Sequence, residues 1–221
     1  MSQATRFGRP ARRNRRLLRA VLIALLAIAV PRFAHAQRTA DARLDGAAAA
    51  AIERIVAGAA EDGLPVEPLR DKVAEGLSKG AGGALIVRAV ERLRDRLALA
   101  SSALGGDASA PDLVAAAALL DLGVTEAHLQ RIRSARPDRP VASALVGLAF
   151  LIQRGAGTDG AVSIVYDMLV ARVSDSEFDR FRETVARDIE AGAPVTGAAR
   201  ARASAAILRV RGGSLAPGGA A

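Results

Sequence analysis

Cysteine and tryptophan are absent from this chain of 221 residues, and lysine occurs only at Lys72 and Lys79. Without cysteine the protein forms no disulfide bonds and offers no thiolate to a metal ion. No lipid can be attached to a cysteine after export either. Stability must therefore come from packing. We interpret the scarcity of lysine and the abundance of alanine as genomic composition with little functional content.

Histidine is also scarce: the chain has two, and His128 is the only one after residue 36. A zinc site normally draws on several Cys and His side chains, and a Ser-His-acid triad would have to use His128. No nucleophile motif such as G-x-S-x-G and no P-loop accompanies it. We therefore predict no catalytic, cofactor-binding or metal-binding residues, and we expect His128 to lie at the surface.

Acidic residues are missing from residues 1–36, which hold eight arginines. The arginines precede an apolar run, Ala20–Val30, that is shorter than the roughly 20 residues of a membrane-spanning helix. Small residues follow at Ala34 and Ala36. This order is typical of a secretory signal peptide. We predict a cleavable signal peptide over 1–36, with Gln37 as the first residue of the mature chain.

Removal of this segment changes the charge of the protein. The whole chain has a formal charge of +8, whereas the residues after position 36 include 23 basic and 23 acidic side chains. A nucleic-acid binder needs a concentrated excess of Lys and Arg. We therefore expect an exported protein, periplasmic or secreted, that binds no nucleic acid in its mature form and has no permanent membrane anchor.

Apolar residues recur at intervals of three and four along most of the mature chain. Ile86, Val90, Leu93 and Leu97 form one such stripe, with charged residues between them. This spacing predicts amphipathic helices with one buried face. We expect helices over 46–62, 66–79, 84–104, 111–122, 126–135, 139–154, 159–173, 175–191 and 195–208. The stretch 161–173 is rich in β-branched residues, so a strand is the alternative there.

Glycines end several of these patterns, at Gly63, Gly123 and Gly192 and more loosely at 80–82 and 155–157. Glycine tolerates the left-handed conformation after the last helical turn, and the apolar residue that follows can fold back onto that turn. The fold class predicted is all-α, an array or bundle of about seven to nine short helices joined by tight glycine-containing turns. Some joints are spaced like helix-pair repeats, but no repeat signature is present.

The predicted domain organisation is simple. The signal peptide is followed by a single helical domain over 37–211, with an internal boundary, if there is one, at 105–111. Residues 212–221 are rich in glycine and proline and are expected to be a disordered tail. Thr125, Thr158 and Ser174 stand where helices begin and are candidate N-caps, and Ser174 to Glu177 fits a capping box.

Four arginines, Arg131, Arg133, Arg136 and Arg139, lie within nine residues. Guanidinium groups bind phosphates and carboxylates, so these residues are a candidate anion-binding site of the cell envelope. The alternative is a solvated helix end, where arginine is favoured by the helix dipole. We favour the solvated helix end.

The four aromatic residues of the mature chain, Phe150, Tyr166, Phe178 and Phe181, all belong to its C-terminal half. Because large rings dominate core burial, we expect a shared core. The alternative is a binding groove beside these rings that would include Asp167. An aspartate in an apolar segment is notable, but its neighbours at helical spacing are polar, so we expect it to face water.

These observations favour a non-catalytic, exported helical protein that binds another macromolecule, an envelope protein or polymer, or has a structural role in the envelope. Two alternatives remain. One is a carboxylate-dependent hydrolase of envelope polymers, which would use a pair of acids. The other is an anionic-surface binder that uses the arginine cluster.

The first testable prediction concerns processing. Because the basic, apolar and small-residue segments follow the order of a signal peptide, the exported protein should begin at Gln37. Mass spectrometry of exported protein checks this directly. An intact 15–36 segment in that protein would contradict the prediction.

Overall fold

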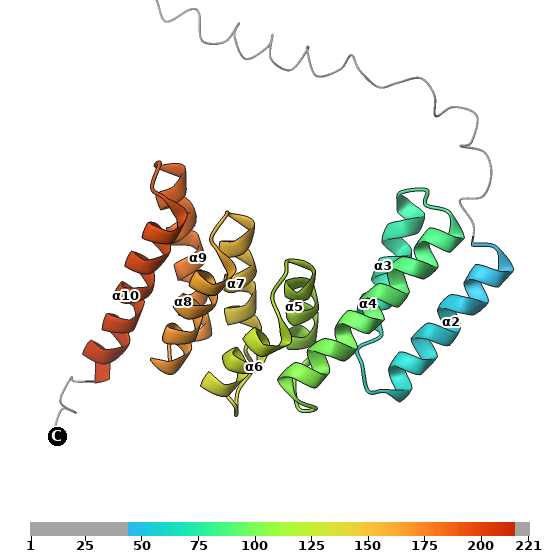
Figure 1. The fold of residues 1–221 in the computed structure, drawn as a ribbon, viewed down its shortest axis with the longest axis horizontal. Helices are drawn as coiled ribbons and strands as arrows, with labels where there is room; N and C mark the ends of the chain where they lie inside the picture. Colours follow the sequence, from blue (N-terminus) through green and yellow to red (C-terminus); the bar gives the residue numbers. More distant parts are fainter. Residues whose placement is uncertain (1–43, 215–221) are drawn as a thin grey trace, which may run out of the picture. The chain divides into compact units, whose positions relative to one another are not determined.

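The computed structural model describes residues 44–214, and this part of the chain is helical with no strand (Figure 1). The all-α prediction is confirmed, and residues 161–170 are helical, not extended. The helices are α2 (Gly46–Glu61), α3 (Glu67–Ser78), α4 (Gly83–Leu104), α5 (Ala110–Asp121), α6 (Glu126–Ala135), α7 (Ala142–Gln153), α8 (Thr158–Val170), α9 (Asp175–Glu190) and α10 (Val195–Ser214).

The helices alternate between two rows. Each even-numbered helix packs on the next one, so that α2, α4, α6, α8 and α10 form one row. In the other row α5 packs on α7 and α7 on α9, while α3 makes little contact with α5. The rows pack on each other through pairs such as α4 with α5 and α9 with α10. Each helix thus contacts mainly helices that are one or two places away along the chain, as in an α-solenoid.

One backbone motif closes six of the joints between these helices. At the α5–α6 joint, Gly123 N–H donates to the carbonyl of Leu120 (3.2 Å) and Val124 N–H donates to that of Leu119 (3.0 Å). This is the Schellman motif. The same pair of bonds recurs around residues 63, 80, 155, 172 and 192. The residue after the turn folds back into the core, as the buried Val124 shows.

Arg172 occupies the left-handed position of the α8–α9 joint with a φ of 60°, and it is the one non-glycine residue with positive φ in the described part of the chain. A side chain in this conformation costs of order 1–3 kcal/mol and persists only where its surroundings enforce it. The next residue, Val173, is completely buried, and its carbonyl accepts a hydrogen bond from Arg136. These contacts hold the joint in place.

Two of the three candidate N-caps, Thr125 and Ser174, start their helices as expected, whereas Thr158 does not cap α8, because Gly157 is its N-cap residue and no side chain caps it. The Thr125 hydroxyl accepts from the N–H of His128 (3.3 Å), and His128 Nδ1 accepts in return from the N–H of Thr125 (3.4 Å). Ser174 accepts from the N–H of Glu177 (3.3 Å). The return bond of this predicted capping box is not formed, because the Glu177 carboxylate binds Arg209 on α10 instead (2.7 Å).

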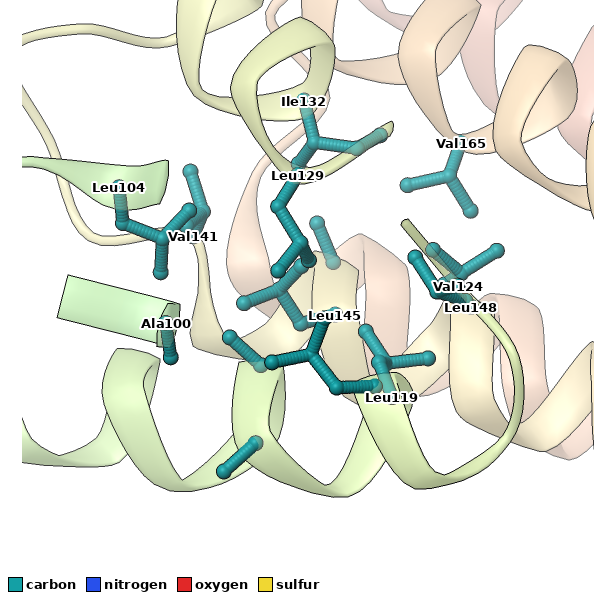
Figure 2. Packing of buried hydrophobic residues seen from close by; sticks show 14 of the residues in the cluster. Ala100, Leu104, Leu119, Val124, Leu129, Ile132, Val141, Leu145, Leu148 and Val165 are labelled. Atoms are coloured by element: carbon teal, nitrogen blue, oxygen red, sulfur yellow. The ribbon is translucent and has the colours of Figure 1, made fainter. Parts of the chain in front are cut away.

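The core lies between the two rows and is aliphatic around α5, α6 and α7 (Figure 2). Leu119, Leu129 and Leu145 meet there from three different helices. These three leucines are fully buried. Burial of a leucine side chain contributes roughly 1.5–3 kcal/mol to the stability of the folded state. This aliphatic packing therefore supplies the stability that a cysteine-free chain cannot obtain from disulfide bonds.

Most predicted helix boundaries lie within three residues of those observed, and the last helix is the exception. α10 continues to Ser214 instead of ending at 208. Ile207 and Val210 still pack against the core, and Arg209 is held by Glu177, so the last turns have partners. Residues 212–214 are therefore helical and not part of a disordered tail. The predicted signal peptide and the tail segment 215–221 lie outside the described residues.

The second prediction tests the strained joint. Arg172→Gly should leave the melting temperature unchanged or raise it by up to about 3 °C, because relief of left-handed strain slightly exceeds the entropy cost of glycine. Gly123→Ala should lower it by about 3–6 °C, since a φ of 85° is unfavourable for alanine even though its Cβ would meet no atom within 4 Å. Thermal unfolding measures both changes.

Arg172→Ala is the matched control, because it removes the side chain but keeps the strained backbone. Its melting temperature should match that of the wild type. A fall with both Arg172→Gly and Arg172→Ala would show instead that the arginine side chain itself stabilises the joint.

Candidate functional site

The predicted arginine cluster divides into residues with different roles, and Arg136 belongs to the fold. Only 6% of it is exposed. Its Nη1 donates to Asp175 Oδ1 (2.6 Å) and to the Pro140 carbonyl (3.2 Å), and its Nη2 donates to the Val173 carbonyl. The guanidinium also lies 6.0 Å from the ring centroid of Phe178. Arg136 therefore ties the end of α6 to the α8–α9 joint.

Arg133 is engaged in a similar way. Its Nη2 binds Asp107 in the α4–α5 connection (2.7 Å), and its Nη1 donates to the carbonyl of Arg139 (3.0 Å). Arg131 stacks over the ring of Tyr166 at 4.5 Å. The Arg139 side chain is exposed and has no ion pair with any residue between 44 and 214. Anion binding by Arg131 and Arg139 stays a prediction, whereas the donors of Arg133 and Arg136 are largely used within the chain.

Asp112 is a buried carboxylate that the sequence analysis missed. Only 1% of it is exposed, and both its oxygens are bonded. Oδ2 accepts from the N–H and hydroxyl of Ser109 (3.1 and 2.7 Å), and Oδ1 accepts from the N–H of Val141 (2.8 Å). The pattern Ser-Ala-Pro-Asp at 109–112 is a capping-box signal that could have been recognised. The bond to Val141, which fixes the start of α7, has no signal in the sequence.

The aromatic residues do not form a single site. Phe178 and Phe181 are completely buried, as a core requires. Phe150 and Tyr166 are half-buried at the edge of the core, and each lies under a guanidinium group, that of Arg154 being 5.2 Å from the Phe150 ring. Two rings thus lie inside the core as expected, and the other two pack against its edge and are partly exposed.

His128 bridges the starts of two helices. Its Nδ1 accepts from the Thr125 N–H, and its Nε2 lies 3.2 Å from Asp159 Oδ1 on α8. Nε2 must carry the proton if both contacts are hydrogen bonds. Both ring nitrogens thus have partners that orient α6 and α8. Within residues 44–214 no group of three or more His, Cys, Asp or Glu side chains is placed to hold a metal ion.

An open groove runs between α8 and α10, and we call it the α8–α10 groove. Two adjoining cavities of ≈240 and ≈620 Å³ form it, and both are lined by Asp167, Ser204 and Ile207. Arg200 lines the smaller cavity and Arg211 the larger. Of the residues predicted to lie at a groove, Asp167 is at this one, and its side chain is exposed.

The four arginines of α10 fall into two pairs. Arg202 holds Asp188 of α9 through two bonds of 2.6 Å, and this lowers the pKa of the Asp188 carboxyl from its usual value. Arg209 likewise binds Glu177 of α9. Arg200 and Arg211, at the α8–α10 groove, form no ion pair within the described residues.

Two further cavities lie at the other end of the helical array. One, of ≈480 Å³, is between α2 and α4. The other, which we call the α3–α5 groove, has a volume of ≈430 Å³ and lies where α3 and α5 make little contact. Ala89 and Leu93 of α4 and Val114 of α5 give it an apolar lining, and Asp71 and Asp121 also line it.

Comparison of the chain with family models, with curated proteins and with solved structures finds no match. The helices between residues 44 and 214 include none with the length and apolar character needed to cross a bilayer.

The third prediction separates the buried rings from the surface rings. Phe178→Ala should lower stability by about 3–5 kcal/mol, because it empties a fully packed site. Phe150→Ala should cost less than about 1.5 kcal/mol, since this ring is half-exposed and has fewer packing partners to lose. Urea unfolding of both variants provides the comparison. Equal losses would show that the Phe150 ring is as tightly packed as that of Phe178.

Proposed function

We propose that this protein is a non-catalytic, exported helical scaffold that binds another macromolecule or has a structural role in the cell envelope. The observation that carries the proposal is the two-row helical array with open grooves between neighbouring helices of the same row. Solenoids of stacked helices present extended surfaces, and they use these surfaces for binding. This support is an analogy at the level of the fold, because function is determined by sites and not by folds.

The grooves fit this role better than they fit a catalytic one. The α8–α10 groove combines exposed aliphatic side chains with charged groups at its edges, as a protein-binding surface does. Its acid, Asp167, stands opposite arginines and not opposite a second acid. A glycosidase-type mechanism requires two facing carboxylates, one of which stays protonated.

A specific observation supports the hydrolase alternative at the α3–α5 groove, where Asp71 and Asp121 line one cavity. The Asp121 side chain is 67% exposed and binds Arg96 (3.0 Å). A general acid needs surroundings that keep it protonated, such as burial away from cations. Asp121 has the opposite surroundings, so binding is the better-supported function.

The fourth prediction tests binding against hydrolysis. A photo-reactive amino acid placed at Ser204 or Val114 should cross-link an envelope macromolecule when the exported protein is irradiated in its native envelope. The matched control places the same group at Glu183, which is exposed on α9. Mass spectrometry of the adducts identifies the partner. Adducts are expected at one or both grooves and not at the control position.

The hydrolase alternative is examined with purified protein and isolated envelope polymers. We expect no release of soluble fragments. Fragment release that Asp71→Asn or Asp121→Asn abolishes, together with no groove-specific adduct, would overturn the proposed function.

A further inference from the structure

The α8–α10 groove has an apolar centre. Val170 and Leu208 line its larger cavity, and they are 56% and 65% exposed. Leu208 is the most exposed large apolar side chain in the described part of the chain. Ile207 lies beside them, partly buried. Leu208 therefore projects from the surface and at the same time lines the larger cavity beside it. A projecting side chain and a cavity that could receive one thus lie next to each other.

The charges around this centre have no ion-pair partners among residues 44–214. On the α9 side of α10, Arg202 and Arg209 are paired with acids of α9. On the groove side, Arg200 and Arg211 lack ion partners among residues 44–214, and so does Asp167 of α8. The charges of α10 that face α9 are thus paired within the fold, whereas the α8–α10 groove presents arginines of α10 and the carboxylate of Asp167 on α8 to solvent.

We propose that the α8–α10 groove is the contact surface for a second copy of this chain, related by a two-fold axis. A two-fold interface uses the same patch twice, so the patch must complement itself. This groove meets that condition in shape, because it holds a projecting leucine and a cavity side by side. It also meets it in charge, because it presents Asp167 together with Arg200 and Arg211.

The cavities indicate how two copies fit. Ser163 and Asp167 of α8 share a cavity with Arg200, whereas Asp167 and Val170 share one with Leu208 and Arg211. A two-fold axis parallel to these helices lays α10 of each copy over α8 of the other. Leu208 of one copy then covers Val170 of the other. Asp167 of each copy comes within side-chain reach of the arginines on the other.

The size of the surface sets the expected strength. α8 has 13 residues and is therefore about 20 Å long. Two adjacent helices of about 10 Å diameter give a face of roughly 400 Å² per copy. This is about half the area of a standard stable interface, which buries about 800 Å² per partner. The dimer is therefore a weak one that forms at micromolar or higher protein concentration.

The fifth prediction is that the purified exported protein is monomeric at low micromolar concentration and dimeric at high micromolar concentration. Sedimentation equilibrium measures this change. Leu208→Arg should abolish the dimer, because it places a third arginine in the centre of the patch. Leu85→Arg is the matched control, since Leu85 is similarly exposed (56%) but lies on α4, and this variant should dimerise like the wild type.

A charge exchange tests the arrangement independently of folding. Asp167→Arg should weaken the dimer, and so should the double variant Arg200→Asp/Arg211→Asp. Combining all three substitutions exchanges the signs and should restore dimerisation. Circular dichroism confirms that each variant is folded.

Three outcomes would overturn the proposal: a monomer at every concentration, a dimer that Leu208→Arg leaves intact, or a triple variant that stays monomeric. A monomeric protein whose groove cross-links an envelope macromolecule would assign the surface to that partner. Self-association is measured with pure protein, so its failure leaves the proposed function in place.

Discussion

The Schellman joint is the constraint on which the rest of this structure depends. Each joint reverses the chain within a few residues and satisfies the free carbonyls at the end of a helix. It also directs the next apolar residue, such as Val124 or Val173, into the core. Repetition of one joint gives a regular alternation between two rows. The array is therefore determined largely by local geometry, and each helix packs mainly on helices that are one or two places away along the chain, with a weaker contact between α7 and α10.

Two connections between helices lack this motif, and buried polar side chains take its place. Asp112 binds Ser109 at the end of the α4–α5 connection and Val141 at the start of α7, and Arg136 holds the α6–α7 connection against the α8–α9 joint. Each side chain is nearly inaccessible to water, so loss of either would leave partners unsatisfied at a cost of about 1–3 kcal/mol per buried group. These contacts join parts of the chain that are about 30 to 40 residues apart, which the local joints cannot do.

The helices and most of their ends could be predicted because their signals are local. The stripe of Ile86 and Val90, the N-cap at Thr125 and the glycine at 123 each act within one or two turns.

The role of Arg136 could not be predicted. In the sequence it is one of four neighbouring arginines, and its burial depends on where the α8–α9 joint lies in space. The same holds for Tyr166, whose apolar neighbours favour a core position, whereas the fold places it at the edge of the core beneath Arg131. The exposure of Asp167 could be predicted because its neighbours at helical spacing are polar. The arginines of α10 that lie across the groove from it could not be predicted, because they belong to a helix more than 30 residues later in the chain.

The two faces of α10 show how a single helix can serve both the fold and an interaction. A charge that stabilises the fold needs a partner on the neighbouring helix, as Arg202 has in Asp188 and Arg209 has in Glu177. Such pairs at the surface contribute little energy, roughly 0–1 kcal/mol, but they fix the orientation of α10 on α9. The orientation in turn determines which residues point into the groove. Arg200, Leu208 and Arg211 are exposed there because the opposite face of the helix is already committed to α9. The groove is thus a consequence of how α10 is held, and changes at the α9–α10 contact would alter its shape and its charge together.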